Sequence, residues 1–175
     1  NRTDERIDAL AKDLGLDFNG ISDEPNTALH QLEAPRVALY KSWVANMDEG
    51  WTRWLLNGYA FAPDTLHNGE IQSGDLSKYH AIILPHQGSS TMLNGHAKGT
   101  MPDAYVGGLG PEGTVALKRY VDEGGTIVAL DGASDFLIQH FGLPVQNAVS
   151  GVSSRQFFIP GSLIRLDVDA SHPMA

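Results

Sequence analysis

Short apolar runs alternate along this chain with stretches of helical spacing, and this alternation limits the fold more than any other feature. RVALY (36–40), HAIILP (80–85) and TIVAL (126–130) are predicted strands, and a predicted helix lies in each interval between them. HAIILP lacks polar alternation, which is typical of a parallel strand covered on both faces. The pattern predicts an α/β domain: a three-layer, doubly wound, mostly parallel sheet with helices on both faces.

Turn and capping residues set the expected limits of the helices. Asp48 is expected to begin the first helix of the sheet domain. Pro111 and Ser134 are expected to mark the starts of two later helices. These helices are expected to bury six residues: Trp51, Trp54, Leu55, Leu117, Tyr120 and Val121. Three weaker runs are read as further strands: YAFAP (59–63), LPVQNAV (143–149) and SLIRLDVD (162–169). A long glycine-rich loop is expected from His86 to Gly110.

The first 34 residues form a separate region in this interpretation. Thr3 is expected to cap a helix that ends before Gly15, and residues 16–34 have the composition of a linker. The domains are therefore 1–34, a helix with its linker, and 35–175, the α/β domain. The apolar stripe of this helix is expected to be buried against another surface. The alternatives are its own sheet, a neighbouring domain, or a second copy of the chain in a homodimer.

Composition excludes several kinds of function. The 175 residues carry a formal net charge of -9 without a local Lys/Arg cluster, which disfavours nucleic acid and anionic membranes as partners. No apolar run approaches the length of a membrane span. Zero cysteines exclude disulfides, thiolate zinc sites and a cysteine nucleophile. The start at Asn1 and the end soon after a predicted strand suggest a fragment of a longer protein.

The carboxyl ends of parallel strands are where such sheets bind ligands, so the loops that follow the strands hold the candidate residues. Three loops should meet there: 41–48, 86–110 and 131–134. The crevice candidates are His86, Gln87, Gly88, Asp131, Gly132 and Ser134. No residue is assigned as catalytic or as a metal ligand.

Several phrases of the sequence resemble one family. PRVALYKSW, GWTRWLL, DLSKYHAIILP, GGTIVALDGAS and PGSLIRLDVDASHPMA look like the class I glutamine amidotransferase-like domain appended to some bacterial zinc carboxypeptidases, over residue 35 to the end. The resemblance implies a flavodoxin-like sheet, an upstream peptidase domain as partner in the same chain, and a periplasmic or secreted location. Zinc would belong to that peptidase domain, and no cofactor is expected in the present chain.

The cysteine nucleophile of active amidotransferases is missing from this sequence. Those enzymes carry Gly-x-Cys-x-Gly at a sharp strand-to-helix turn, where this sequence has Ala129-Leu130-Asp131-Gly132-Ala133, so Asp131 or Gly132 takes the place of the nucleophile. Their His-x-Glu pair is not evident either, because His172 is followed by Pro173. The resemblance therefore predicts a non-catalytic accessory domain, a pseudoenzyme.

Other chemistry remains as alternatives. Asp131 is read first as a turn or capping residue and second as a nucleophile or metal ligand. An independent hydrolase would use His86, Asp131 and Ser134, or a triad that includes Ser89 or Ser90, and a ligand-binding crevice without turnover is a third alternative.

Metal and phosphate motifs are weak. His30 and Glu33 have the His-x-x-Glu spacing of a zinc ligand pair but are read as coincidence, and His86 and His96 are read as solvated loop residues. Gly107 to Gly110 lacks the Lys-Ser/Thr of a phosphate loop and is read as a hinge.

Overall fold

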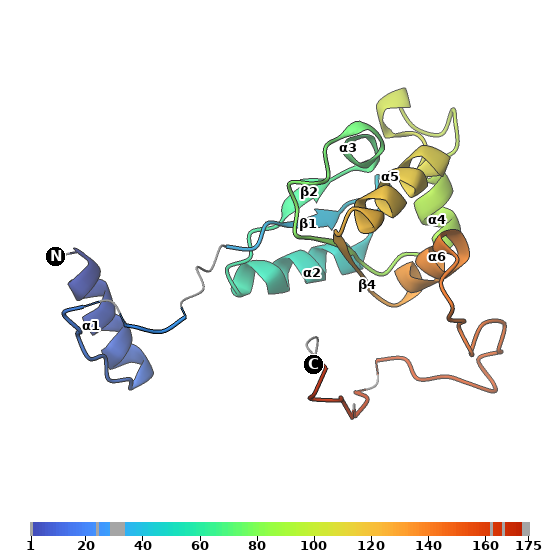
Figure 1. The fold of residues 1–175 in the computed structure, drawn as a ribbon. Coiled ribbons are helices and arrows are strands. Elements are labelled where there is room, and N and C mark those ends of the chain that lie inside the picture. Colours follow the sequence, from blue (N-terminus) through green and yellow to red (C-terminus); the bar gives the residue numbers. More distant parts are fainter. Residues whose placement is uncertain (1, 24, 29–33, 162, 166, 173–175) are drawn as a thin grey trace. The chain divides into compact units, whose positions relative to one another are not determined.

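A computed structural model describes residues 2–23, 25–28, 34–161, 163–165 and 167–172 (Figure 1). The chain divides into two compact units, Asn1–Ala34 and Pro35–Ala175. The first contains α1 (Arg2–Leu14), after which Gly15 has a φ of 63° and ends the helix as predicted. Thr3 lies inside α1 and not at its cap. His30 and Glu33 lie outside the described residues.

Four parallel strands form the sheet of the second unit. They are β1 (Val37–Tyr40), β2 (Asp64–Leu66), β3 (Ala81–Leu84) and β4 (Thr126–Ala129), in the order β2-β1-β3-β4. Each neighbouring pair is parallel. Flavodoxin-like sheets place their first four strands in this order. The predicted α/β class with a parallel sheet is therefore confirmed.

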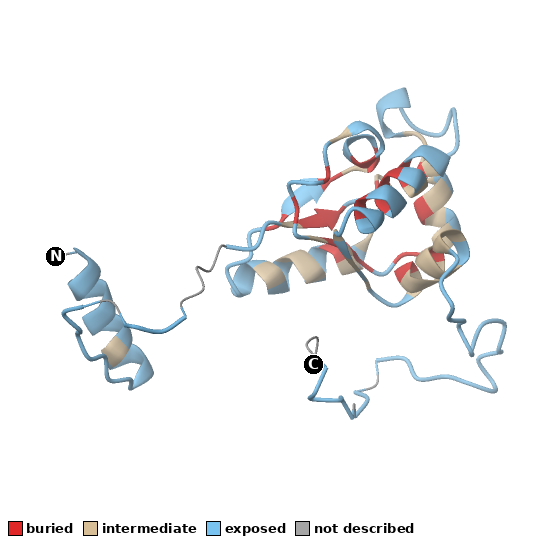
Figure 2. Cartoon of the chain, viewed as in Figure 1, coloured by how far each residue is buried: buried red, intermediate tan, exposed pale blue. Residues whose placement is uncertain are grey.

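Helices flank the sheet. They are α2 (Met47–Gly58), α3 (Asn68–Ser73), α4 (Ser89–Asn94), α5 (Gly110–Asp122) and α6 (Gly132–Phe141), and the 3-10 helix η1 spans Asp103–Tyr105. Figure 1 shows α2 on the side of the sheet opposite to α3 and α5. The main core forms under α3, α5 and α6, where Ile82, Leu84, Leu117 and Phe136 are fully buried (Figure 2).

The α2 face of the sheet is only partly covered. Leu39, Ile83 and Val128 are register partners on β1, β3 and β4, so their side chains share this face. Leu39 is fully buried, Ile83 is half-buried and Val128 is 39% exposed. Coverage of this face therefore decreases from β1 toward β4.

The orientation of α2 corrects the sequence prediction. Trp51, Trp54 and Leu55 are 61%, 69% and 52% exposed, so the predicted burial of these residues is wrong. Glu49 is buried instead, and Arg53 binds Glu49 Oε1 at 2.7 Å, the Pro63 carbonyl at 3.2 Å and Thr65 Oγ1 at 3.0 Å. The polar face of α2 is thus attached to the protein and its apolar face is exposed.

Other predicted limits also differ. Asn46, not Asp48, caps α2, because its Oδ1 accepts the backbone N–H groups of Asp48 and Glu49. YAFAP is not a strand, since β2 begins only at Asp64. The predicted loop 86–110 contains α4 and η1, while Val121 on α5 is 38% exposed.

No strand is present in 143–149 or in the described residues of 162–169, where Ser162 and Leu166 are not described. Their apolar side chains, such as Val145 and Ile164, are exposed. Among the described residues, no helix combines the length and apolar character that crossing a membrane requires.

Candidate functional site

The turn between β4 and α6 has the sharp backbone that the sequence predicted. Asp131 has φ 47° and ψ −119°, and α6 begins at the next residue. Among the described residues, only Ala60 and Asp131 combine a side chain with a positive φ. Such a conformation costs on the order of 1–3 kcal/mol, and strained strand-to-helix turns carry the nucleophile in α/β-hydrolases. Asp131 therefore occupies the strained position of the turn, while Gly132 starts the helix.

His86 contacts both residues of this turn. Its Nδ1 lies 2.9 Å from Asp131 Oδ2 and 3.1 Å from the backbone nitrogen of Gly132. A protonated Nδ1 donates to the carboxylate, whereas an unprotonated Nδ1 accepts the Gly132 N–H, so the two hydrogen bonds compete for one nitrogen. The side chains of His86 and Asp131 are 47% and 83% exposed, so the pair is open to water.

The loops at the carboxyl ends of the strands contact one another here. Asn46 Nδ2 donates to the backbone carbonyl of His86 at 3.0 Å, which ties the loop after β1 to the loop after β3. His86 in turn contacts the loop after β4 through Asp131. The sequence reasoning missed Asn46, because an asparagine in a loop gives no signal of its own beyond helix capping.

The other predicted crevice residues lie around this pair. Gln87 is 7% exposed, and its Oε1 has no hydrogen-bond partner among the described residues. Gly88 is the N-cap of α4. Ser134 does not cap α6, and its hydroxyl donates to the Ala129 carbonyl at 3.3 Å. Asp131 is itself the N-cap residue of α6 but makes no side-chain capping hydrogen bond.

The serines of the hypothetical triad are engaged elsewhere. Ser89 Oγ donates to Gln139 Oε1 at 2.7 Å, and Ser90 Oγ accepts from Asn94 Nδ2 at 3.2 Å. Neither contact involves His86, so the structure does not assemble a Ser-His-Asp arrangement from these residues.

His96 and the glycine-rich segment help to hold the fold. His96 Nε2 lies 3.2 Å from the Trp43 carbonyl, and its own carbonyl accepts the Gly107 N–H at 2.9 Å. Asn68 Nδ2 donates to the Gly107 carbonyl at 3.0 Å. Within the described part of the chain, no three His, Cys, Asp or Glu residues cluster as metal ligands would.

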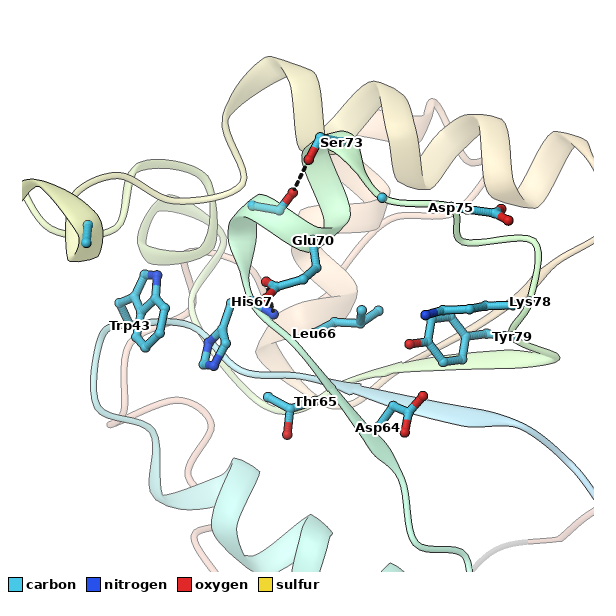
Figure 3. Close-up of a pocket in the computed structure, with 13 residues that line it drawn as sticks. Trp43, Asp64, Thr65, Leu66, His67, Glu70, Ser73, Asp75, Lys78 and Tyr79 are labelled. Atoms are coloured by element: carbon cyan, nitrogen blue, oxygen red, sulfur yellow. Dashed lines mark hydrogen bonds between the residues drawn. The ribbon is translucent and has the colours of Figure 1, made fainter.

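A separate open groove runs along β2, with a cavity volume of about 670 Å³ (Figure 3). We call it the β2 groove. Six of its lining residues carry its chemistry: Trp43, Asp64, His67, Glu70, Lys78 and Tyr79. The sequence reasoning missed this groove because its residues come from three separate segments of the chain.

Two pKa shifts belong to this groove. Burial raises the pKa of Tyr79, with smaller effects from hydrogen bonds to Lys78 and Asp64. Hydrogen bonds from the hydroxyl and backbone N–H of Ser77 lower the pKa of Asp75.

Comparison of the chain with protein-family models, with curated proteins and with solved structures finds no match in any of the three.

Proposed function

We propose that this chain is a non-catalytic, class I amidotransferase-like accessory domain of a larger zinc carboxypeptidase. The peptidase domain would supply the zinc and the hydrolytic chemistry, in the periplasm or outside the cell. The present domain would pack on that neighbour and support its stability or its substrate cleft. The proposal rests on the resemblance of residues 35–175 and on the chemistry of the β4–α6 turn.

The residues found at the β4–α6 turn are the main support for the proposal. Acyl transfer at such a turn needs a nucleophile and a free backbone N–H that stabilises the oxyanion. Here the nucleophile position holds Asp131, whose side chain is 83% exposed, and the N–H of Gly132 lies 3.1 Å from His86 Nδ1. Water screens the exposed Asp131 carboxylate, which makes it a weak nucleophile. The His86 ring also fills the position at the Gly132 N–H where an oxyanion would bind. The turn thus keeps its shape without the reagent of an amidotransferase.

The exposed face of α2 supports docking on a neighbouring domain. Four side chains along this face, Met47, Trp51, Trp54 and Tyr59, are 61–74% exposed. The rings of Trp51 and Trp54 are in contact at 6.0 Å between centroids. Aromatic side chains bury about 150–250 Å² each, so this face with the adjacent Leu55 and Phe61 approaches the roughly 800 Å² that one partner contributes to a standard interface. We assign the peptidase domain as its occupant.

A binding experiment tests this assignment. The peptidase region and the present chain are expressed separately, and their association is measured by calorimetry. Replacing Trp51 and Trp54 by serine should weaken binding at least tenfold. Val115→Ser is the matched control, because Val115 is 67% exposed on α5. Equal binding by both variants would rule out the α2 face as the docking surface. If the chain instead associates with itself, and the tryptophan changes abolish that association, the face belongs to a second copy.

Hydrolysis at the same turn is the second candidate function, and the contact between His86 and Asp131 is the observation that favours it. A strained aspartate at such a turn could attack the alkyl carbon of an ester, form an aspartyl ester and expel the carboxylate of the substrate. Water activated by the histidine could then hydrolyse the aspartyl ester, which releases the alcohol and regenerates Asp131. Turnover of an ester panel by the isolated chain, lost in Asp131→Asn, would establish this function.

A further inference from the structure

The β2 groove lies apart from the turn at Asp131, and its volume of about 670 Å³ is within the usual range for small-molecule sites. Both signs of charge line it, with carboxylates from Asp64, Glu70 and Asp75 and one ammonium from Lys78. Figure 3 shows flat aromatic rings at one end and Lys78 with Tyr79 at the other. A ligand that fills the groove therefore meets different chemistry at each end.

The end near Tyr79 offers an ammonium group. Lys78 Nζ lies 4.9 Å from the centroid of the Tyr79 ring, and the side chains of Lys78 and Asp64 shift the pKa of Tyr79 in opposite directions, Lys78 lowering it and Asp64 raising it. Within the described part of the chain, Lys78 forms no ion pair with a carboxylate. Its ammonium points into the groove in Figure 3, so it is available to a ligand carboxylate, with Asp64 beside it for a ligand ammonium.

The other end offers a fixed carboxylate beside stacked rings. His67 stacks on Trp43 with 3.8 Å between ring centroids and an angle of 7° between the planes. His67 Nδ1 lies 2.7 Å from the Lys41 carbonyl, which requires the proton on Nδ1. The Glu70 carboxylate accepts the His67 backbone N–H at 3.0 Å and is held in place. A planar guanidinium can pair with such a carboxylate and stack on a neighbouring ring.

The length of the groove suits a ligand with a charge at each end. Asp64 and His67 lie three residues apart on extended backbone, which places their Cα atoms about 10 Å from each other. An extended arginine, with its carboxylate and its guanidinium at opposite ends, fits within this length. We propose that the β2 groove binds a basic amino acid, arginine in particular, either free or at the carboxyl end of a peptide. Its α-carboxylate pairs with Lys78 and its guanidinium with Glu70. Asp64 accepts from the α-nitrogen, which is an ammonium in the free amino acid and an amide N–H at a peptide end.

Calorimetry on the whole chain with three small ligands tests the charge pattern. Arginine should bind, whereas agmatine, which lacks the carboxylate, and citrulline, which lacks the cation, should bind at least tenfold more weakly. Glycyl-arginine distinguishes the two sources. Binding equal to that of arginine assigns the site to peptide ends, and much weaker binding assigns it to the free amino acid. Arginine that binds no better than citrulline would overturn the proposal.

A matched pair of variants tests the position of the site. Glu70→Gln keeps an oxygen that can accept the His67 N–H, so the capping contact of α3 survives while the charge is lost. This variant should weaken arginine binding at least tenfold, and Glu112→Gln in the first turn of α5 should not change it. Equal affinity in the two variants would refute the site. The result is independent of the accessory function proposed above, because it uses the isolated chain and no peptidase.

Discussion

His86 Nδ1 lies 2.9 Å from Asp131 Oδ2, so the loop after β3 is tied to the strained turn after β4 by one ring nitrogen. The same nitrogen lies 3.1 Å from the Gly132 backbone nitrogen. Under the accessory function proposed above, this geometry places a histidine where the oxyanion of an acyl-transfer enzyme would sit. The His86 contact thus fixes the geometry of this turn from a separate loop of the chain.

Asp131→Gly should stabilise the domain. Glycine adopts the positive φ of 47° without the side-chain strain, which costs on the order of 1–3 kcal/mol. Two effects oppose this stabilisation by about 1 kcal/mol together. The variant loses the exposed contact with His86, and glycine has extra conformational freedom in the unfolded chain. We expect the free energy of unfolding in urea to rise by roughly 1 kcal/mol. Asp131→Ala removes the carboxylate but keeps the strain, so a glycine variant no more stable than the alanine variant would contradict the argument.

Arg53→Met should destabilise the domain. Arg53 neutralises Glu49, which is 5% exposed, and joins α2 to Pro63 and Thr65. Removing one partner of a buried pair leaves an uncompensated charge, and we expect a loss of about 3 kcal/mol in urea unfolding. The control is Lys118→Met, whose 3.7 Å pair with Asp122 is exposed and should contribute less than about 0.5 kcal/mol. Similar losses in both variants would show that Glu49 does not depend on Arg53.

Tyr40 should make stability fall at high pH. Burial raises the pKa of Tyr40 to about 12, and the hydrogen bond with Ser42 opposes this effect. The pKa of a tyrosine in the unfolded chain is near 10. The neutral Tyr40 side chain therefore contributes its full stabilisation below about pH 10, and the free energy of unfolding falls by about 2–3 kcal/mol as the pH rises to 12. Urea unfolding at pH 9 and pH 11.5 measures it.

Tyr40→Phe should reduce this pH dependence, although it also loses the 2.8 Å hydrogen bond to Asn68 at every pH. Tyr59→Phe is the control, because Tyr59 is 73% exposed. Unchanged pH dependence in Tyr40→Phe would assign the alkaline transition to other groups.

Trp54→Ala should cost the isolated chain little. Trp54 is 69% exposed, so most of its surface remains in water, and we expect a change within about 1 kcal/mol. Leu117→Ala, at a fully buried position in the core, should cost about 2–5 kcal/mol. Comparable losses in the two variants would mean that α2 turns its apolar face inward, as the sequence alone predicted.

The example of α2 shows why the sequence predicts some features and not others. Helical spacing correctly groups Trp51, Trp54 and Leu55 on one face, but spacing does not say whether the sheet or another surface covers that face. The Arg53 contacts decide it, and they depend on Thr65 in a distant strand. The turn at Asp131 was predictable because its signal is local.

The predicted C-terminal strands and the β2 groove show the opposite case. Alternation in 162–169 indicates a strand, but a strand needs a neighbour to pair with, and the described residues of that range have none. The groove brings Trp43, His67 and Lys78 together only through tertiary structure. Non-local pairing therefore limits what this sequence predicts.

The accessory function requires a longer protein with a peptidase domain, and its most direct test is the peptidase activity of that protein with and without residues 35–175. Zinc-dependent kcat/KM is measured on a peptide panel for both forms, alongside the isolated chain and the intact protein with Asp131→Ala. The accessory function predicts cleavage by the intact protein, altered substrate range or stability after deletion, no effect of Asp131→Ala, and no turnover by the isolated chain. Hydrolysis by the isolated chain that Asp131→Ala abolishes would contradict it.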